Sequence, residues 1–224
     1  MEKPILFKTE MVQAILAGKK SMTRRIIKPQ PNGQLKCVIK HETKGRSCWM
    51  EDNADQLSKD FKFHKYYEVG DILWVRETWA KLCRVDENGY THYDEETIYY
   101  AADGGPSIDL YDADGFLLDD QNMKWRPSIF MPRYAARLFL KVKDIRVERL
   151  QDITEEDARS EGIKWTNEGP LHAHYLNHNL NAFLNFKTSK EAFSSLWDNI
   201  NLKRGYGWGI NPWVWVVEFE RVEA

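Results

Sequence analysis

The alternation of apolar and polar residues over 137–147 constrains the fold more than any other feature of this chain. Leu138, Leu140 and Val142 occupy one face of a predicted strand, but beyond Asp144 the apolar positions continue on odd numbers. A slip of one residue is what a β-bulge produces, and bent strands of this kind are used to close small barrels. The sequence therefore predicts a long, bent strand in a barrel-like sheet.

Short apolar runs predict further strands. They have the length of strands rather than of helices, and turn-forming residues bound them. The predicted runs cover residues 4–8, 72–75, 97–100 and 213–219. The run at 97–100 ends a predicted hairpin over residues 90–101.

Capping signals predict three helices. Thr9 and Thr154 are candidate N-caps, and Gly18 and Gly162 are the corresponding stops. The third helix begins with a capping box over Thr188–Glu191, and its apolar residues recur at helical spacing. Together with the strands, these helices predict an α+β fold.

The predicted architecture is one domain over residues 1–224, a small β-barrel of about five to six strands flanked by helices. Segments rich in turn formers interrupt it. We interpret residues 29–67, 102–124 and 164–187 as long loop insertions.

The composition excludes several classes of protein. Hydrophobic residues make up 42% of the 224 residues, which suits a packed core and argues against a disordered chain. No apolar run approaches the roughly 20 residues that cross a bilayer, and no signal-peptide pattern follows Met1. Three separated cysteines do not form a disulfide framework. We therefore expect a cytoplasmic protein with no membrane partner; protein partners stay unknown.

The formal net charge of −2 conceals an uneven distribution. Residues 1–48 carry a net charge of +8, residues 49–123 of −12, residues 124–149 of +6 and residues 150–224 of −4. Two basic blocks separated by an acidic one can present a local anion-binding face, unless the charges mix in space and cancel.

The densest basic segment, residues 18–25, follows the predicted stop of the first helix. Its four cations and two hydroxyls suit a phosphate or another oxyanion. A lysine among like charges favours its neutral form, and a neutral amine can deprotonate a nearby hydroxyl. Lys20 and Thr23 are therefore a candidate base and nucleophile, although basic loops more often contact solvent or phosphate.

Two carboxylates are candidates for a proton donor. Glu161 stands at the C-terminal end of the second predicted helix, where the helix dipole does not favour a carboxylate, and Glu77 follows a predicted strand. A partly buried carboxylic acid can keep its proton near neutral pH and donate it to a leaving amine. Surface glutamates are far more common than such acids.

Aromatic residues and histidines offer two further patterns. Trp79, beside a strand exit, and Trp125, beside Arg126, are placed to stack on a base. His172, His174 and His178 have the density of a metal site, but no acidic or cysteine partner adjoins them, so a polar surface loop is favoured. We expect no metal and no cofactor.

The chain resembles the ASCH domain family of the PUA-like superfamily. The residues that carry the resemblance are Gly18, Lys20 and Arg25, which match a G-x-K-x-x-x-x-R type motif after the first helix, with Gly70-Asp71-Ile72-Leu73 and Val217-Glu218-Phe219 further along. Residues 74–79 and 125–132 further resemble larger ASCH proteins of phages and prophages. The resemblance implies a small β-barrel flanked by helices.

The resemblance also implies a chemistry. A small member of the family removes the acetyl group from N(4)-acetylcytidine with a lysine base, a threonine nucleophile and a glutamate proton donor, and these match Lys20, Thr23 and Glu161. Arg25 and backbone N–H groups are then candidates for stabilising the oxyanion. Glu77, Trp79, Trp125 and Arg126 are candidates for binding the substrate.

Two alternatives stay open at this point. Other ASCH proteins resemble non-catalytic RNA-binding modules, and some cleave single-stranded RNA, so the expected partner is a modified nucleoside or single-stranded RNA. The chain is also about twice the size of the small amidohydrolase, and the three insertions can reshape its pocket.

Overall fold

A computed structural model describes most of the chain. The described residues are 1–30, 35–40, 47–51, 67–85, 91–104, 124–166, 173–177 and 182–223. No helix within these ranges is long and apolar enough to cross a bilayer.

The fold is α+β and contains a five-stranded sheet. Its strands, in spatial order, are β1 (Glu2–Leu6), β5 (Ile72–Arg76), β8 (Phe139–Arg149), β12 (Trp213–Val222) and β2 (Met22–Ile26). β1 runs parallel to β5, and β2 runs antiparallel to β12. Over the described residues the sheet is open, with β1 and β2 as its edges, so the predicted closed barrel is not confirmed.

The chain divides into two compact units, which are described separately. Unit 1 comprises Met1 with residues 18–71 and 141–220, and unit 2 comprises residues 2–17, 72–140 and 221–224. The basic segment and Glu161 belong to unit 1. Glu77 and the aromatic candidates belong to unit 2.

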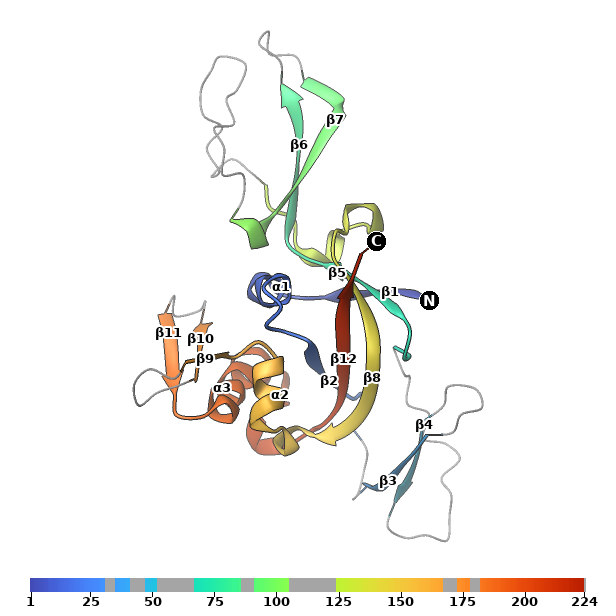
Figure 1. Cartoon of the computed structure of the whole chain (residues 1–224), viewed down its shortest axis with the longest axis vertical. Helices are drawn as coiled ribbons and strands as arrows, with labels where there is room; N and C mark the ends of the chain where they lie inside the picture. The colour runs from blue at the N-terminus through green and yellow to red at the C-terminus, as the bar shows by residue number, and fades with distance from the viewer. Residues whose placement is uncertain are drawn as a thin grey trace. The chain divides into compact units, whose positions relative to one another are not determined.

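Unit 1 places two helices beside β2, β8 and β12. These are α2 (Glu155–Ser160) and α3 (Ser189–Asn201), which pack on each other and, in Figure 1, lie near the small sheet labelled β9 to β11. Apolar side chains from α3, β2 and β12 form a common core with that sheet. Its fully or nearly buried members include Met22, Leu150, Phe193, Trp197, Val214 and Val216.

Unit 2 combines α1 (Thr9–Leu16) with β1, β5 and a hairpin of β6 (Trp79–Val85) and β7 (Thr91–Tyr100). Two short 3-10 turns lie further along the chain, at Ser128–Phe130 and Arg133–Ala135. Val12 and Ile15, which are three residues apart and so share one face of α1, are buried. A smaller core forms around Trp79 with Met131 and Ala135.

The long strand predicted from the phase slip is β8. Leu140 and Val142 are buried while Lys141 and Lys143 are exposed, and beyond Asp144 the buried position moves to Ile145. The change of phase that the sequence predicts is therefore present in the burial pattern. Figure 1 shows β8 as a curved strand beside β12.

The predicted helix caps are confirmed at two of three helices. The Thr154 hydroxyl accepts a hydrogen bond from the backbone N–H of Asp157 (3.1 Å), and Thr188 and Glu191 form the complete capping box of α3. At α1 the prediction was wrong. Thr9 is the first helical residue, and Lys8 occupies the N-cap position without a side-chain hydrogen bond.

Regular structure occupies two of the three segments interpreted as loop insertions. β3 (Leu35–Lys40) and β4 (Ser47–Glu51) form a hairpin within residues 29–67. β9 (Lys164–Trp165), β10 (Ala173–Asn177) and β11 (Ala182–Phe186) form a three-stranded sheet within residues 164–187. These strands were not predicted, because each is only two to six residues long and too short to show an alternating pattern among turn-forming residues. Most of residues 102–124 lie outside the described ranges.

Candidate functional site

The second half of the basic segment is part of an edge strand rather than a loop. β2 begins at Met22, and Lys20 precedes it in an antiparallel backbone bridge with Glu161. The neighbouring backbone is fixed on both sides, because the N–H of Ser21 donates to the carbonyl of Ser160 and the N–H of Phe219 donates to the carbonyl of Ser21, each at 2.9 Å. Ser21 therefore connects the C-terminus of α2 to β12.

The structure brings Lys20 and Glu161 together as a buried ion pair. Lys20 Nζ lies 2.7 Å from Glu161 Oε2, and the two side chains are 1% and 5% exposed. The same ammonium also donates to the backbone carbonyl of Glu161 at 2.8 Å. It therefore caps the C-terminus of α2, where the helix dipole favours a cation. This contact explains why a carboxylate is tolerated at that helix end.

Burial is the main influence on the protonation of Lys20. It lowers the pKa of the Lys20 amine below its usual value, Glu161 opposes that effect, and the charges of Arg25 and Arg24 add to the lowering. Loss of hydration disfavours a charged amine, and nearby cations act in the same direction. Losing the proton therefore costs the Lys20 ammonium less free energy than it costs a lysine at the surface.

Thr23 and Arg25 occupy alternate positions of β2. In the register with β12, Thr23 pairs with Val217 and Arg25 with Trp215, and Thr23 is 4% exposed. Burial lowers the pKa of Arg25, while Tyr67 and Glu161 oppose that shift. Arg25 therefore lies within electrostatic range of Glu161. The predicted base, proton donor and oxyanion cation thus belong to one region of unit 1.

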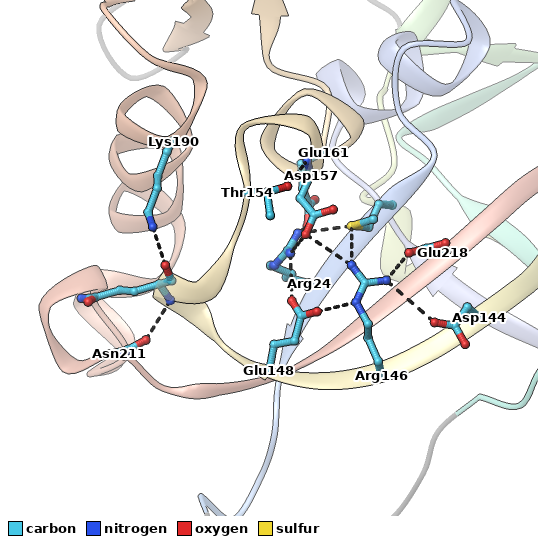
Figure 2. A network of polar contacts seen from close by, with 12 residues as sticks. Arg24, Asp144, Arg146, Glu148, Thr154, Asp157, Glu161, Lys190, Asn211 and Glu218 are labelled. Atoms are coloured by element: carbon cyan, nitrogen blue, oxygen red, sulfur yellow. Dashed lines mark hydrogen bonds and ion pairs between the residues drawn. The ribbon is translucent and has the colours of Figure 1, made fainter. Parts of the chain in front are cut away.

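Arg24 was not among the catalytic or substrate-binding residues predicted from the sequence, and was considered only as a contact for RNA. Its side chain is fully buried, and it contacts three carboxylates: Asp157 at 2.6 Å, Glu148 at 3.2 Å and Glu161 Oε1 at 3.4 Å. Figure 2 shows these contacts converging on its guanidinium from α2 and β8. No sequence signal indicated this role, because residues 18–25 were interpreted as a basic loop; on the observed strand β2, Arg24 lies on the opposite face from Thr23 and Arg25.

A second arginine extends this network toward the surface. Arg146 on β8 contacts Glu148 and Glu218, and its Nη2 lies 3.3 Å from Asp157 Oδ2 (Figure 2). Its side chain is 28% exposed, whereas that of Arg24 is 0% exposed. Burial lowers the pKa of Arg146, but its hydrogen bonds to Glu148 and Glu218 outweigh burial and raise it overall. Asp157 and Glu148 therefore each bridge both arginines.

Glu77 takes part in an ion pair of unit 2. Its carboxylate, 1% exposed, accepts two hydrogen bonds of 3.1 Å from Arg137, which also binds Asp103. Burial raises the pKa of Glu77, and Arg137 opposes the shift. Arg137 in turn stacks on Tyr100 at 3.8 Å. The bidentate geometry is that of a charged pair, which makes Glu77 a structural anchor rather than a free proton donor.

The aromatic candidates of unit 2 differ in accessibility. Trp79 is 2% exposed, packs against Met131, and has the Arg126 guanidinium 5.1 Å from its ring centroid. These contacts argue against stacking of a base on Trp79. Trp125 is 36% exposed, so one candidate ring is accessible.

No metal site is found in the described part of the chain. Among those residues, no group of three or more His, Cys, Asp or Glu side chains is arranged to hold an ion. The side chains of His172, His174 and His178 lie outside what the structure describes, so the histidine cluster stays a sequence-based hypothesis.

Comparisons with protein-family models, curated proteins and solved structures find no match to this chain. The resemblance to ASCH domains therefore stays a prediction based on its motif residues.

Proposed function

We propose that the protein is an amidohydrolase of an acylated nucleoside such as N(4)-acetylcytidine. The observation that supports this best is the buried pair of Lys20 and Glu161. Thr23 follows Lys20 by three residues and is itself buried. Burying two charges is costly, and a pair of apolar side chains in their place is often equally stable. Stability alone therefore does not account for the buried pair, whereas transfer of a proton between its two members does.

The proposed acylation step starts from the neutral form of the pair. This form has as many protons as the ion pair, with one proton moved from Lys20 to Glu161. The Lys20 amine takes the hydroxyl proton of Thr23, and the Thr23 oxygen forms a bond to the amide carbonyl carbon. As the C–N bond breaks, Glu161 donates its proton to the departing exocyclic amine. The products are the free nucleoside amine, acyl-Thr23 and the ion pair.

The proposed deacylation step restores the starting state. The Glu161 carboxylate takes a proton from water, and the hydroxide oxygen bonds to the acyl carbon. When the ester bond to Thr23 breaks, the Lys20 ammonium returns a proton to the threonine oxygen. Arg25 stabilises the negative oxygen that develops in both steps. One water is consumed, and a carboxylic acid and an amine leave.

The described contacts give less support to the RNA-binding alternative. That reading requires the cations of the basic segment to reach phosphates. Lys20 and Arg24 are 3% and 5% exposed, and the contacts of Arg24 are with carboxylates. Charges that are neutralised inside the protein release no counterions from a nucleic acid.

Incubation with N(4)-acetylcytidine tests the proposal. We expect the wild-type protein to release cytidine and acetate, as measured by chromatography. Glu161→Gln removes the proton donor, so kcat/KM is expected to fall by about 10² to 10⁴-fold. Release at the same rate by both proteins, or none by the wild type, would contradict the proposal. Glu156→Gln, which changes another carboxylate of α2, is the matched control and is expected to react like the wild type.

The value of kcat/KM is expected to fall on the alkaline side of its pH profile, because the pair is inactive once it has lost its last proton. Since burial lowers the pKa of Lys20 below 10.5, the alkaline limb is expected below that value. A rate that keeps rising through pH 10.5 would contradict this assignment. Initial rates across the pH range, with stability checked at each end, give the measurement.

A further inference from the structure

Arg24 and Lys20 contact different oxygens of the Glu161 carboxylate. The ammonium binds Oε2, whereas Arg24 Nη1 lies 3.4 Å from Oε1, so each oxygen of the carboxylate has one cationic partner. A carboxylate held at both oxygens cannot rotate freely about its last torsion angle. The orientation of the proposed proton donor therefore depends on Arg24 as well as on Lys20.

Arg24 is itself held firmly. Asp157 and Glu148 bind its Nη2, and the Phe193 ring of α3 lies 5.9 Å from its guanidinium carbon. Nη1 also approaches the sulfur of Met22 at 3.3 Å. Such supporting contacts preorganise a catalytic group without taking part in the chemistry.

We infer that Arg24 is a positioning residue for the Lys20–Glu161 pair: its charge and its contact with Oε1 hold the Glu161 carboxylate in place beside Lys20. The inference rests on the proposed amidohydrolase function for its kinetic consequences. Its electrostatic part is independent of any substrate, because the positive charge of Arg24 lowers the pKa of the neighbouring Lys20.

The groups that face the pair allow charge and geometry to be separated. Lys20 and Glu161 are surrounded by the cations Arg24 and Arg25, and Asp157 and Glu148 lie behind Arg24. Arg24→Met removes both the charge and the orientation. Arg24→Lys keeps the charge but loses the planar fork that holds two partners at once. The two variants therefore have different expected signatures.

Titration of Lys20 by NMR tests the electrostatic part without substrate. The Cε signal of Lys20 is assigned by its loss in Lys20→Arg, and its chemical shift is followed with pH. We expect the pKa of Lys20 to rise in Arg24→Met and to stay as in the wild type in Arg24→Lys. Arg146→Lys is the matched control, because Arg146 shares Asp157 and Glu148 with Arg24 but lies beyond them from the pair. An unchanged titration in Arg24→Met would overturn the inference.

Kinetics test the orienting part. In Arg24→Lys, kcat on N(4)-acetylcytidine is expected to fall roughly tenfold or more with little change in KM, because a misaligned donor affects the transition state rather than binding. The alkaline limb should stay in place. Full activity in Arg24→Lys would overturn this part, and that variant still decides it if Arg24→Met does not fold. Absence of activity in the wild type would contradict the amidohydrolase, while the titration would still judge Arg24.

Discussion

Replacing Lys20 by methionine is expected to lower the free energy of unfolding by about 3 kcal/mol. Removing one partner of a buried ion pair leaves the other charge uncompensated, which typically costs about 3–5 kcal/mol. The lower end applies here because Arg24 still contacts Glu161 Oε1. The substitution also removes the ammonium that binds the backbone carbonyl of Glu161, the C-cap residue of α2. Urea unfolding, followed by tryptophan fluorescence, measures the change.

Two companion variants separate pairing from packing. Lys19→Met alters the adjacent, exposed lysine and is expected to change the free energy of unfolding by less than about 0.5 kcal/mol. In Lys20→Met/Glu161→Gln the orphaned charge is gone, so part of the loss should be recovered. If Lys20→Met were as stable as Lys19→Met, the pair would not be buried as described.

Local signals in the sequence predicted much of unit 1 because they depend on neighbouring residues alone. Thr154 and the box of Thr188 and Glu191 cap their helices through contacts three residues away. The slip at Asp144 predicted the changed phase of β8 because side chains alternate along any strand. Glu161 was a candidate because the helix dipole disfavours a carboxylate at the C-terminal end of a helix. Its buried partner is Lys20, which the motif had also indicated.

Features that depend on distant parts of the chain were not predictable in this way. The segment at 18–25 has the composition of a solvated basic loop, but its Arg24 is neutralised by Glu148 and Asp157, more than 120 positions further along. Trp79 follows a strand exit, where an aromatic ring is often exposed, but Met131 and Arg126 cover it. Sequence periodicity carries no information about which distant element supplies such a partner.

Thr23→Ala is expected to lower kcat/KM on N(4)-acetylcytidine by about 10³-fold or more. The substitution deletes the oxygen proposed to attack the amide carbonyl in the acylation step, and loss of a nucleophile removes most of the catalysis, leaving what binding and oxyanion stabilisation supply. The fold should persist, because the pairing of Thr23 with Val217 uses the backbone. Cytidine release and circular dichroism check the two parts.

Thr23→Ser is the matched variant, because it keeps the hydroxyl and loses one methyl group. Under the amidohydrolase hypothesis it retains activity within about tenfold of the wild type, while Thr23→Ala does not. The RNA-binding alternative predicts no difference between the two variants. It requires that both bind an oligonucleotide with the same affinity and that this affinity falls steeply with salt. Equal, slow cytidine release by the wild type and Thr23→Ala, together with such binding, would replace the amidohydrolase with an RNA-binding module.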